Sequence, residues 1–591
     1  MLSELHQVLL GCEYRYTPAH KIPKGTPLCT YSDARGFYVK SYSTKGGEFD
    51  IALNFTGDPH ITLPTAFVLK TPEQFIGRLI PHINMGWYLC YVEEMEADWD
   101  SNDLRGLYEH VDRQIQHTLQ AAVASTIQGT PDDREMEGEF SSYWLSDKQV
   151  YLLSDAVEKV ELRCIVAENL YVQDNSESAA CEEWIAYKDD DAHELAEWIK
   201  QRNLSRRDDK ATLTSYFKIR PSRLAGVDWP PQNFREVLQW LSEVDPGARS
   251  RVLNNFVNNP VKRHVLLFDV HHQDLIGLYV EIDLEATGLN TYAKKKNRKK
   301  HTGRHVKHGT LNSCLSAKHS IRKFIRLGVT RADRKTILSR NRRRSSIGDL
   351  STKRIALIGC GTIGGYLAGL LLRSGAGCGK ARFDIYDPDS FGPQNFGRHP
   401  LSTANFGQNK AVATAAELRL STHLSCTVRG KPFRFLIDPE LLKQYDIVID
   451  ATGRPPVAKR LAYVVRTMPN DTRPLLVHGL NDGNGRASKV LIDEGSSCFG
   501  CLLADPAFYK NGSDIRFEHI RSDERRVSCG NTYTPYDASV SVITASMMQE
   551  AVLSILEPKL DWTYSEHMLD GSRSRQRRLL PRQINCNICH D

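Results

Sequence analysis

The chain has 591 residues, of which 41% are hydrophobic and 25% are charged, and its formal net charge is +6 at pH 7. These values are ordinary for globular proteins, the length predicts three or four domains, and no apolar run reaches the ~18 residues that a membrane helix needs. The first residues include acids and lack the basic stretch of a secretory signal, so we expect a cytoplasmic protein with no membrane segment.

Residues 1 to 148 alternate strand-like and turn-like stretches and end in a helical pattern over 103–125. Before that helix, the segments LPTAFV and PHINMGWYLC lead to Cys90, and acidic and tryptophan residues follow. Taken alone, a cysteine on such an apolar stretch could simply be a buried core thiol.

This order of features resembles the ubiquitin-conjugating fold, in which strands precede an H-P-N-like segment, a glycine and a catalytic cysteine. The resemblance covers roughly 45–125 and implies an α+β domain in which Cys90 carries a thioester. Because the order here is PHIN, either His82 or Asn84 could stabilise the oxyanion while an amine attacks, and each could instead be structural. GEFSSYWL (138–145) resembles a stretch that follows this domain in bacterial fusion enzymes.

Residues 149 to 325 form a mixed block, for which we predict a linker domain. It contains the strand-like segments HVLLFDV and IGLYVEIDL, and the basic run 292–308. That run and RNRRR (340–344) supply much of the positive charge. We interpret them as solvated loops and expect no nucleic-acid binding, because no aromatic residues are interleaved for base stacking.

From residue 326 to 591, continuous apolar strands alternate with helical segments. RIALIGC, ARFDIYD and YDIVIDAT are the strands, and GGYLAGLLLRSG and KAVATAAELRL are the helices. This alternation predicts a parallel sheet covered on both faces. The fold class we predict is therefore α/β plus α+β, with a Rossmann-like C-terminal domain after the N-terminal domain (1–148) and the linker domain (149–325).

A glycine loop joins the first strand of this block to its helix. Gly359, Gly361 and Gly364 form G-x-G-x-x-G, and Asp387 lies 23 residues beyond the last glycine, at the end of the next strand. Such a loop lets backbone amides approach phosphates, and the acid suits a ribose hydroxyl. We therefore expect a nucleotide, although a nicotinamide dehydrogenase or a ligand-free, tightly packed helix would show the same spacing.

The residues after Asp387 indicate triphosphate chemistry. Asn395, Arg398 and Lys410 could bind phosphate oxygens and neutralise charge at the α-phosphate. The stretch IYDPDSFGPQNFGRHPL…FGQNKA resembles ThiF/MoeB-type and ubiquitin-activating enzymes, which use ATP to adenylate the C-terminal carboxylate of a ubiquitin-like protein. The resemblance covers roughly 326–591 and implies ATP and Mg²⁺ as cofactors.

Two further stretches bear on this resemblance. RADRKTIL resembles the family's R-x-x-R-Q stretch, so Arg331 and Arg334 match it; in the family this arginine reaches the partner's ATP site, which implies a homodimer. A basic surface helix is the alternative. IDATGRPP departs from the family's D-x-T-D-N: Asp450 matches the first acid, but Gly453 replaces the second. In the family the second acid helps to hold magnesium, so magnesium binding here is in doubt.

Fourteen cysteines are too sparse for a disulfide scaffold, but four of them form two C-x-x-C pairs. Tetrahedral Zn²⁺ takes close thiolate pairs, so we predict a structural zinc site that leaves no position for a catalytic water. Unpaired buried thiols are the alternative. The same layout occurs in ThiF/MoeB-type enzymes. The predicted ligands are Cys498, Cys501, Cys586 and Cys589.

Cys529 lies between the zinc pairs, behind Arg525 and Arg526 and ahead of an apolar helix that Thr534 or Asp537 could cap. The arginines and the helix amides favour a thiolate. In activating enzymes a cysteine at this place attacks the acyl-adenylate, and SCGNTYTP resembles that loop, which implies a nucleophile. A structural thiol is the alternative.

The domain order resembles the fusion ligases of bacterial anti-phage CBASS operons. The resemblance implies that the C-terminus of a cGAS-like nucleotidyltransferase is adenylated, passed from Cys529 to Cys90 and ligated to a target amine. Three alternatives remain: an adenylyltransferase for a ubiquitin-like sulfur carrier, an NAD(P)-dependent oxidoreductase with a zinc ribbon, and a non-enzymatic scaffold or nucleic-acid binder.

Overall fold

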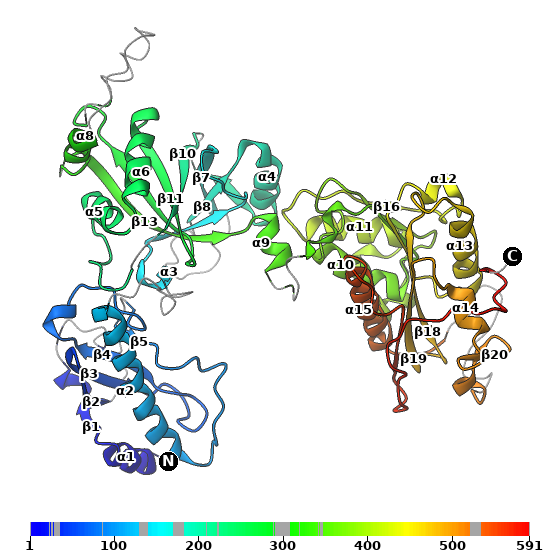
Figure 1. The fold of residues 1–591 in the computed structure, drawn as a ribbon, viewed down its shortest axis with the longest axis horizontal. Coiled ribbons are helices and arrows are strands. Elements are labelled where there is room, and N and C mark those ends of the chain that lie inside the picture. The colour runs from blue at the N-terminus through cyan, green and yellow to red at the C-terminus, as the bar shows by residue number, and fades with distance from the viewer. Residues whose placement is uncertain are drawn as a thin grey trace, which may run out of the picture. The chain divides into compact units, whose positions relative to one another are not determined.

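The structure, a computed structural model (Figure 1), describes most of the chain. The described residues are 2–22, 24, 28, 36–84, 87–128, 140–169, 182–207, 210–220, 224–287, 289, 308–317, 319–340, 342, 347–520 and 534–589. They divide into two units, the first comprising Met1–Asp191 with Asn203–Ala332 and the second comprising Ala192–Arg202 with Asp333–Asp591. Most of the basic run 292–308 lies outside the described residues.

The first unit begins with an antiparallel sheet in the order β1-β2-β3-β4-β5. Helix α2 buries Tyr108, Val111, Ile115 and Leu119, a helical spacing that turns one face toward this sheet's core (Figure 1). The elements are α1 (Leu2–Gly11), β1 (Arg15–Pro18), β2 (Gly36–Thr44), β3 (Gly47–Asn54), β4 (Thr65–Lys70), β5 (Tyr88–Leu89) and α2 (Leu104–Gln128).

A second sheet in this unit has the order β10-β11-β12-β13-β6-β8-β7-β9, and β10 also pairs with β7, so the sheet curls back on itself. Its strands are β6 (Lys148–Leu152), β7 (Leu162–Asn169), β8 (Glu182–Tyr187), β9 (Leu204–Arg206), β10 (Thr212–Ile219), β11 (Arg263–Val270), β12 (Ile276–Ile282) and β13 (Ile321–Arg331). The segments HVLLFDV and IGLYVEIDL, which we predicted to be strands, coincide with β11 and β12.

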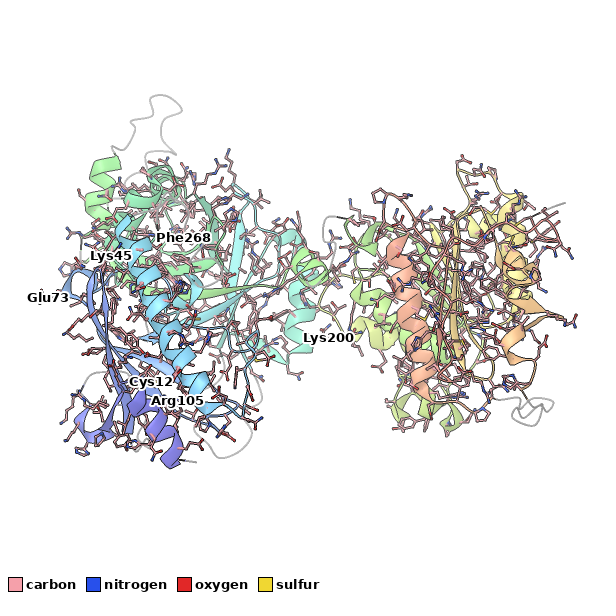
Figure 2. All side chains as sticks on the ribbon, turned by 60° about the horizontal axis from the view of Figure 1, so that its bottom comes forward. Cys12, Lys45, Glu73, Arg105, Lys200 and Phe268 are labelled. Atoms are coloured by element: carbon pink, nitrogen blue, oxygen red, sulfur yellow. The ribbon has the colours of Figure 1, made fainter. Side chains whose placement is uncertain are left out.

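Both faces of this second sheet are buried. On β11, Val265 and Leu267 enter one core, whereas Leu266 and Phe268 (labelled in Figure 2) enter the other, beneath α5 and α6. The helices of this part are α3 (Phe140–Tyr143), α5 (Phe234–Val244), α6 (Pro246–Asn258) and α8 (His308–Leu315).

The second unit is a seven-stranded sheet in the order β16-β15-β14-β17-β18-β19-β22, whose first five strands are parallel. Residues of β14 alternate between two cores: Leu357 joins the one under α10, α11 and α15, and Ala356 joins the one under α13. This arrangement confirms the predicted Rossmann-like sheet with helices on both faces (Figure 1).

The strands of the second unit are β14 (Ile355–Ile358), β15 (Phe383–Tyr386), β16 (Val428–Lys431), β17 (Ile447–Asp450), β18 (Leu475–Asp482), β19 (Ala487–Asp493), β20 (Tyr509–Lys510), β21 (Ser513–Asp514) and β22 (Tyr564–Met568). Its helices are α4 (Ala192–Gln201, with Lys200 labelled in Figure 2), α9 (Arg334–Ser339), α10 (Thr362–Arg373), α11 (Lys410–Leu420), α12 (Pro439–Leu442), α13 (Pro455–Thr467), α14 (Phe499–Ala504) and α15 (Ala538–Ser554).

The strand order determines where a ligand can bind. The chain leaves β14 toward β15 on one side, and β17 lies on the other side of β14. In parallel sheets of this kind, ligands bind in a crevice outside the carboxyl ends of the strands at such a point, so we expect the crevice there. Among the helices that the structure describes, none is both long and apolar enough to cross a bilayer.

Candidate functional site

The glycine loop follows β14 and leads into α10, with Gly361 as the N-cap residue. Gly359 has φ +90°, and a Cβ there would lie 3.1 Å from the backbone nitrogen of Thr452. A Cβ on Gly364 would collide with the carbonyl oxygen of Gly359. Both glycines are therefore required by a tight turn that brings backbone amides to the N-terminus of α10.

Two buried side chains hold this loop through the backbone of Cys360. The N–H of Cys360 donates to Oδ2 of Asp387 at 2.6 Å, and Nε2 of His399 donates to the Cys360 carbonyl oxygen at 3.0 Å. The other oxygen of Asp387 accepts the N–H of Asp389 at 2.8 Å. Burial raises the pKa of the Asp387 carboxyl, while these backbone N–H groups act in the opposite direction. Asp387, our predicted ribose ligand, thus also fixes the loop.

Asn395, Arg398 and Lys410 lie on the segment that connects β15 to α11. Asn395 and Arg398 belong to the short helix η8 (Pro393–Arg398), and Oδ1 of Asn395 accepts the N–H of Gly392 at 3.1 Å. Lys410 begins α11; it is 8% exposed and its Nζ lies 3.4 Å from Oδ2 of Asp389. The basic groups predicted for phosphate binding therefore come from two elements that follow β15.

Arg398 makes two contacts with the segment that precedes α15. Its Nη1 donates to the carbonyl oxygen of Thr534 at 2.8 Å, and its guanidinium lies 4.6 Å from the ring centre of Tyr536. The Tyr536 hydroxyl oxygen is 3.4 Å from Oγ1 of Thr362, the first residue of α10. No local sequence pattern points to Tyr536 or Thr362, since only the fold brings residues so distant in sequence together.

Asp450 ends β17 next to the glycine loop and is buried. Its Oδ1 accepts the N–H of Thr452 at 3.0 Å and the Thr452 hydroxyl at 2.7 Å. Its Oδ2 accepts Nδ1–H of His478, 3.1 Å away on the neighbouring strand β18. His478 is 1% exposed, and no sequence motif marks it as a partner of Asp450. Oδ1 thus accepts two of these bonds and Oδ2 accepts one, so Oδ2 is the oxygen that keeps a lone pair for a metal ion.

Arg334 lies away from this crevice. Arg334 begins α9, and its Nη1 is 3.4 Å from the carbonyl oxygen of Cys378, which follows the C-terminal end of α10. Helix α10 starts at the glycine loop, so Arg334 lies near the end of this helix that is farther from the loop. Arg334 therefore does not reach the predicted nucleotide crevice of its own chain. Arg331 pairs with Asp269 at 3.4 Å within the first unit.

The four cysteines of the two C-x-x-C pairs meet in one cluster, with all sulfur atoms within 4.8 Å of one another. Individual sulfur–sulfur distances are 3.2 Å to 3.9 Å. Tetrahedral Zn²⁺ with Zn–S bonds of ~2.3 Å needs sulfur atoms ~3.8 Å apart, so the cluster fits a metal ion of this kind. Arg466 adds positive charge beside these sulfurs. Its Nη1 and Nη2 donate hydrogen bonds to the two carboxylate oxygens of Asp493 at 2.7 Å and 2.9 Å.

In the first unit Cys90 is exposed, so the alternative of a buried core thiol is wrong. Its N–H donates to the carbonyl oxygen of His82 at 2.8 Å, and His82 has φ +64°. Asn84 makes two hydrogen bonds with the backbone of Tyr88. The Asn84 N–H donates to the Tyr88 carbonyl oxygen at 3.0 Å, and Oδ1 of Asn84 accepts the Tyr88 N–H at 3.2 Å. The PHIN segment thus pairs with residues 88–90, and Cys90 is exposed at the end of this pairing.

Cys529, Arg525 and Arg526 lie outside the described residues. The chain is described again from Thr534, five residues after Cys529, and its carbonyl oxygen contacts Arg398. Asp537 is the N-cap residue of α15, as expected, although its side chain accepts no capping hydrogen bond among the described residues.

Two family models match the chain. The model described as "Prokaryotic E2 family B" matches residues 12–153, and the "ThiF family" model matches residues 333–588. These matches confirm the predicted pairing of a ubiquitin-conjugating-like domain with a ThiF-type domain.

Curated relatives match the chain over its whole length. It is 51% identical over 594 residues to the "ATP-dependent ubiquitin transferase-like protein Cap2" of Vibrio cholerae, covering 100% of both chains. It is 46% identical over 592 residues to the protein of the same name from Escherichia coli, covering 100% of this chain and 99% of that one.

Among solved structures, MccB of E. coli with ATP overlaps 41% of this chain and 67% of its own, at 18% identity and a TM-score of 0.30.

Proposed function

The chain belongs to the family of proteins named ATP-dependent ubiquitin transferase-like protein Cap2, and we propose that it ligates a protein C-terminus to an amine at the expense of ATP. One observation carries this proposal: a single chain combines an exposed cysteine in its E2-like part with a glycine loop around which Asp387, Arg398 and Lys410 gather.

The first step is adenylation at the crevice beside the glycine loop. The loop amides and the N-terminus of α10 receive the phosphates of ATP, and Asp387 lies beside the ribose. A carboxylate oxygen of the substrate attacks the α-phosphorus. The bond between the α-phosphorus and the oxygen that bridges to the β-phosphate breaks, and pyrophosphate leaves. Arg398 and Lys410 neutralise the charge that develops on the leaving group.

Magnesium accompanies the nucleotide in this proposal. Because both oxygens of Asp450 already accept hydrogen bonds from Thr452 and His478, we expect the phosphates and water to supply most ligands of the ion. Asp450 then acts as a fixed negative charge nearby.

Two thioester steps follow. The Cys529 thiolate attacks the acyl carbon and AMP leaves; the Cys90 thiolate then attacks the same carbon and releases Cys529. An amine of the target displaces Cys90 and forms an amide. Since Oδ1 of Asn84 accepts a backbone N–H, its amide nitrogen is the side-chain group suited to donate to the oxyanion, and His82 positions Cys90 through its carbonyl oxygen.

We assign Zn²⁺ to Cys498, Cys501, Cys586 and Cys589 as a structural ion. Four thiolates close the coordination shell, so the ion orders the C-terminus and leaves no site for a substrate.

For partners and organisation, we propose a cGAS-like nucleotidyltransferase from the same CBASS operon as the protein whose C-terminus is activated, in the cytoplasm and in anti-phage defence. A homodimer would let Arg334 reach the nucleotide crevice of its partner, since that arginine lies far from the crevice of its own chain. We propose three functional domains, 1–148, 149–325 and 326–591.

Thioester trapping tests this proposal. With ATP and the substrate protein, non-reducing electrophoresis should show thiol-sensitive adducts; Cys529→Ala should abolish all of them, and Cys90→Ala should keep the Cys529 adduct but block the final product. Cys314→Ala, at a partly exposed cysteine of α8, is the matched control and should behave as wild type. If Cys90→Ala leaves ligation intact, an adenylyltransferase for a sulfur carrier becomes the better account.

A further inference from the structure

Tyr536 lies just before α15 and is fixed on two sides. Its hydroxyl oxygen is 3.4 Å from Oγ1 of Thr362, at the start of α10. On the other side, Gly485 approaches so closely that a Cβ on this glycine would come within 2.7 Å of the Tyr536 Cβ. Gly485 has φ +89°, so the turn between β18 and β19 is shaped to admit the tyrosine. The position of the ring is therefore set without any help from Arg398.

Arg398 rests on this fixed ring. A guanidinium is planar and presents five N–H groups from its edges. The Tyr536 ring, 4.6 Å from the guanidinium carbon, restricts the plane, and the bond from Nη1 to the Thr534 carbonyl oxygen at 2.8 Å fixes one corner. The cation–π contact and the hydrogen bond together therefore restrict where the guanidinium lies.

The held guanidinium belongs to the same part of the crevice as the start of α10. Thr362, which contacts Tyr536, directly follows the N-cap residue Gly361. Helix N-termini carry partial positive charge and exposed amide N–H groups, which favour phosphate. Tyr536 therefore links the phosphate-binding end of α10 to the arginine that we assigned to the same triphosphate.

We propose that Tyr536 is a positioning residue for adenylation, which holds the Arg398 guanidinium at the nucleotide phosphates before ATP arrives. This inference rests on the proposed function. When the substrate carboxylate attacks the α-phosphorus and pyrophosphate departs, negative charge moves onto the leaving group. A guanidinium already fixed in place stabilises that charge without reorganising first.

A purely structural role for Tyr536 predicts something different. If the ring only packs the segment before α15, its loss lowers stability and reduces activity by the same factor whatever residue stands at position 398. If the ring acts through Arg398, its loss matters only while the arginine is present. Non-additivity between the two positions therefore separates the roles.

The test uses the full-length protein with Tyr536→Leu, Tyr536→Phe, Arg398→Ala and the double variant Arg398→Ala/Tyr536→Leu. Exchange of labelled pyrophosphate into ATP is measured with the substrate protein, giving the maximal rate and the KM for ATP, together with the Tm of each variant. Tyr463→Leu is the matched control, since Tyr463 is exposed and lies under Arg460 of α13 at 5.6 Å.

We expect Tyr536→Leu to lower the maximal exchange rate about tenfold and to change the KM for ATP less than about threefold. The rate falls more than binding because the negative charge on the leaving pyrophosphate develops during the reaction, when the Arg398 guanidinium is no longer held in place to stabilise it. Tyr536→Phe keeps the ring and should stay within about threefold of wild type, as should Tyr463→Leu. In the Arg398→Ala background, Tyr536→Leu should add nothing. Equal losses in both backgrounds, or no loss in Tyr536→Leu, overturn the inference, whereas a wild-type protein without exchange overturns the proposed function itself.

Discussion

Asp387 accepts a 2.6 Å hydrogen bond from the backbone N–H of Cys360, and this bond joins the end of β15 to the glycine loop. Asp387→Ala should leave a buried N–H without its acceptor, which costs about 1–3 kcal/mol of stability. Because the loop amides then lose their fixed position, we also expect the Kd for ATP to rise about tenfold. Calorimetric titration with ATP and thermal unfolding measure the two effects.

Asp349→Ala is the control for this variant. Asp349 also accepts a backbone N–H, that of Ser351 at 2.8 Å, but it lies beside Gly375, beyond the C-terminal end of α10. This variant should lose stability and keep its ATP affinity. Equal ATP affinity in both variants would show that Asp387 has no role at the nucleotide.

The cysteines should differ sharply in reactivity. Cys90 is exposed, whereas burial raises the pKa of both Cys360 and Cys378 to about 12. At neutral pH the buried thiols are protonated and shielded, so iodoacetamide should modify Cys90 at least about a hundredfold faster. Peptide mass spectrometry over a time course gives the rates, and mild denaturation should equalise them. Equally fast labelling of Cys360 in the native protein contradicts the structure of the glycine loop.

The cluster of four cysteines in the second unit should hold one zinc ion per chain. Cys498→Ser should remove the ion and lower the Tm. Without the ion, the zinc–sulfur bonds that tie Cys586 and Cys589 to the rest of the unit are lost, so the C-terminal residues are less ordered. Elemental analysis of the purified protein counts the metal. Cys314→Ser should retain one equivalent, and a wild-type protein that contains no zinc when purified without chelators would refute the assignment.

The second unit should lose stability in acid through Glu566. Burial alone would raise its pKa, but hydrogen bonds from Arg516, at 2.8 Å to both carboxylate oxygens, and from Tyr564 lower it to about 2. A lowered pKa contributes stability that is present above the ordinary value of 4.5 and is lost as the pH falls toward 2. The contribution at neutral pH is at most about 3 kcal/mol.

Denaturant titrations between pH 7 and pH 2.5 measure how the free energy of unfolding falls on acidification. Glu566→Gln should be less stable than wild type at pH 7 and should show a shallower decline on acidification. Glu550→Gln, which weakens a half-exposed ion pair with Arg577, should follow the wild-type curve. A wild-type slope in Glu566→Gln would mean that this carboxyl does not carry the acid sensitivity.

Local patterns were enough to predict much of this molecule. The apolar runs of β14, β15 and β17 and the spacing of Gly359, Gly361 and Gly364 identify a Rossmann-like unit, because strand burial and tight turns depend on neighbouring residues. The C-x-x-C pairs likewise predicted a cluster that the fold assembles from residues 498 to 589.

Long-range pairing could not be read from the sequence. His478 meets Asp450 because β17 and β18 align these residues in register, and Tyr536 meets Thr362 across 174 positions of the chain. The closure of the second sheet by β7 and β10 depends on a similar distant pairing. No local pattern specifies such contacts, so the residues that support the predicted ligands were found only in the structure.

Pyrophosphate exchange with a defined substrate end tests the central claim most directly. With ATP, Mg²⁺ and a substrate protein that ends in a normal carboxylate, labelled pyrophosphate should enter ATP, and the same protein with an amidated C-terminus should support no exchange. Exchange that is absent with both substrates, or equal with both, would contradict the account that this chain activates a protein C-terminus.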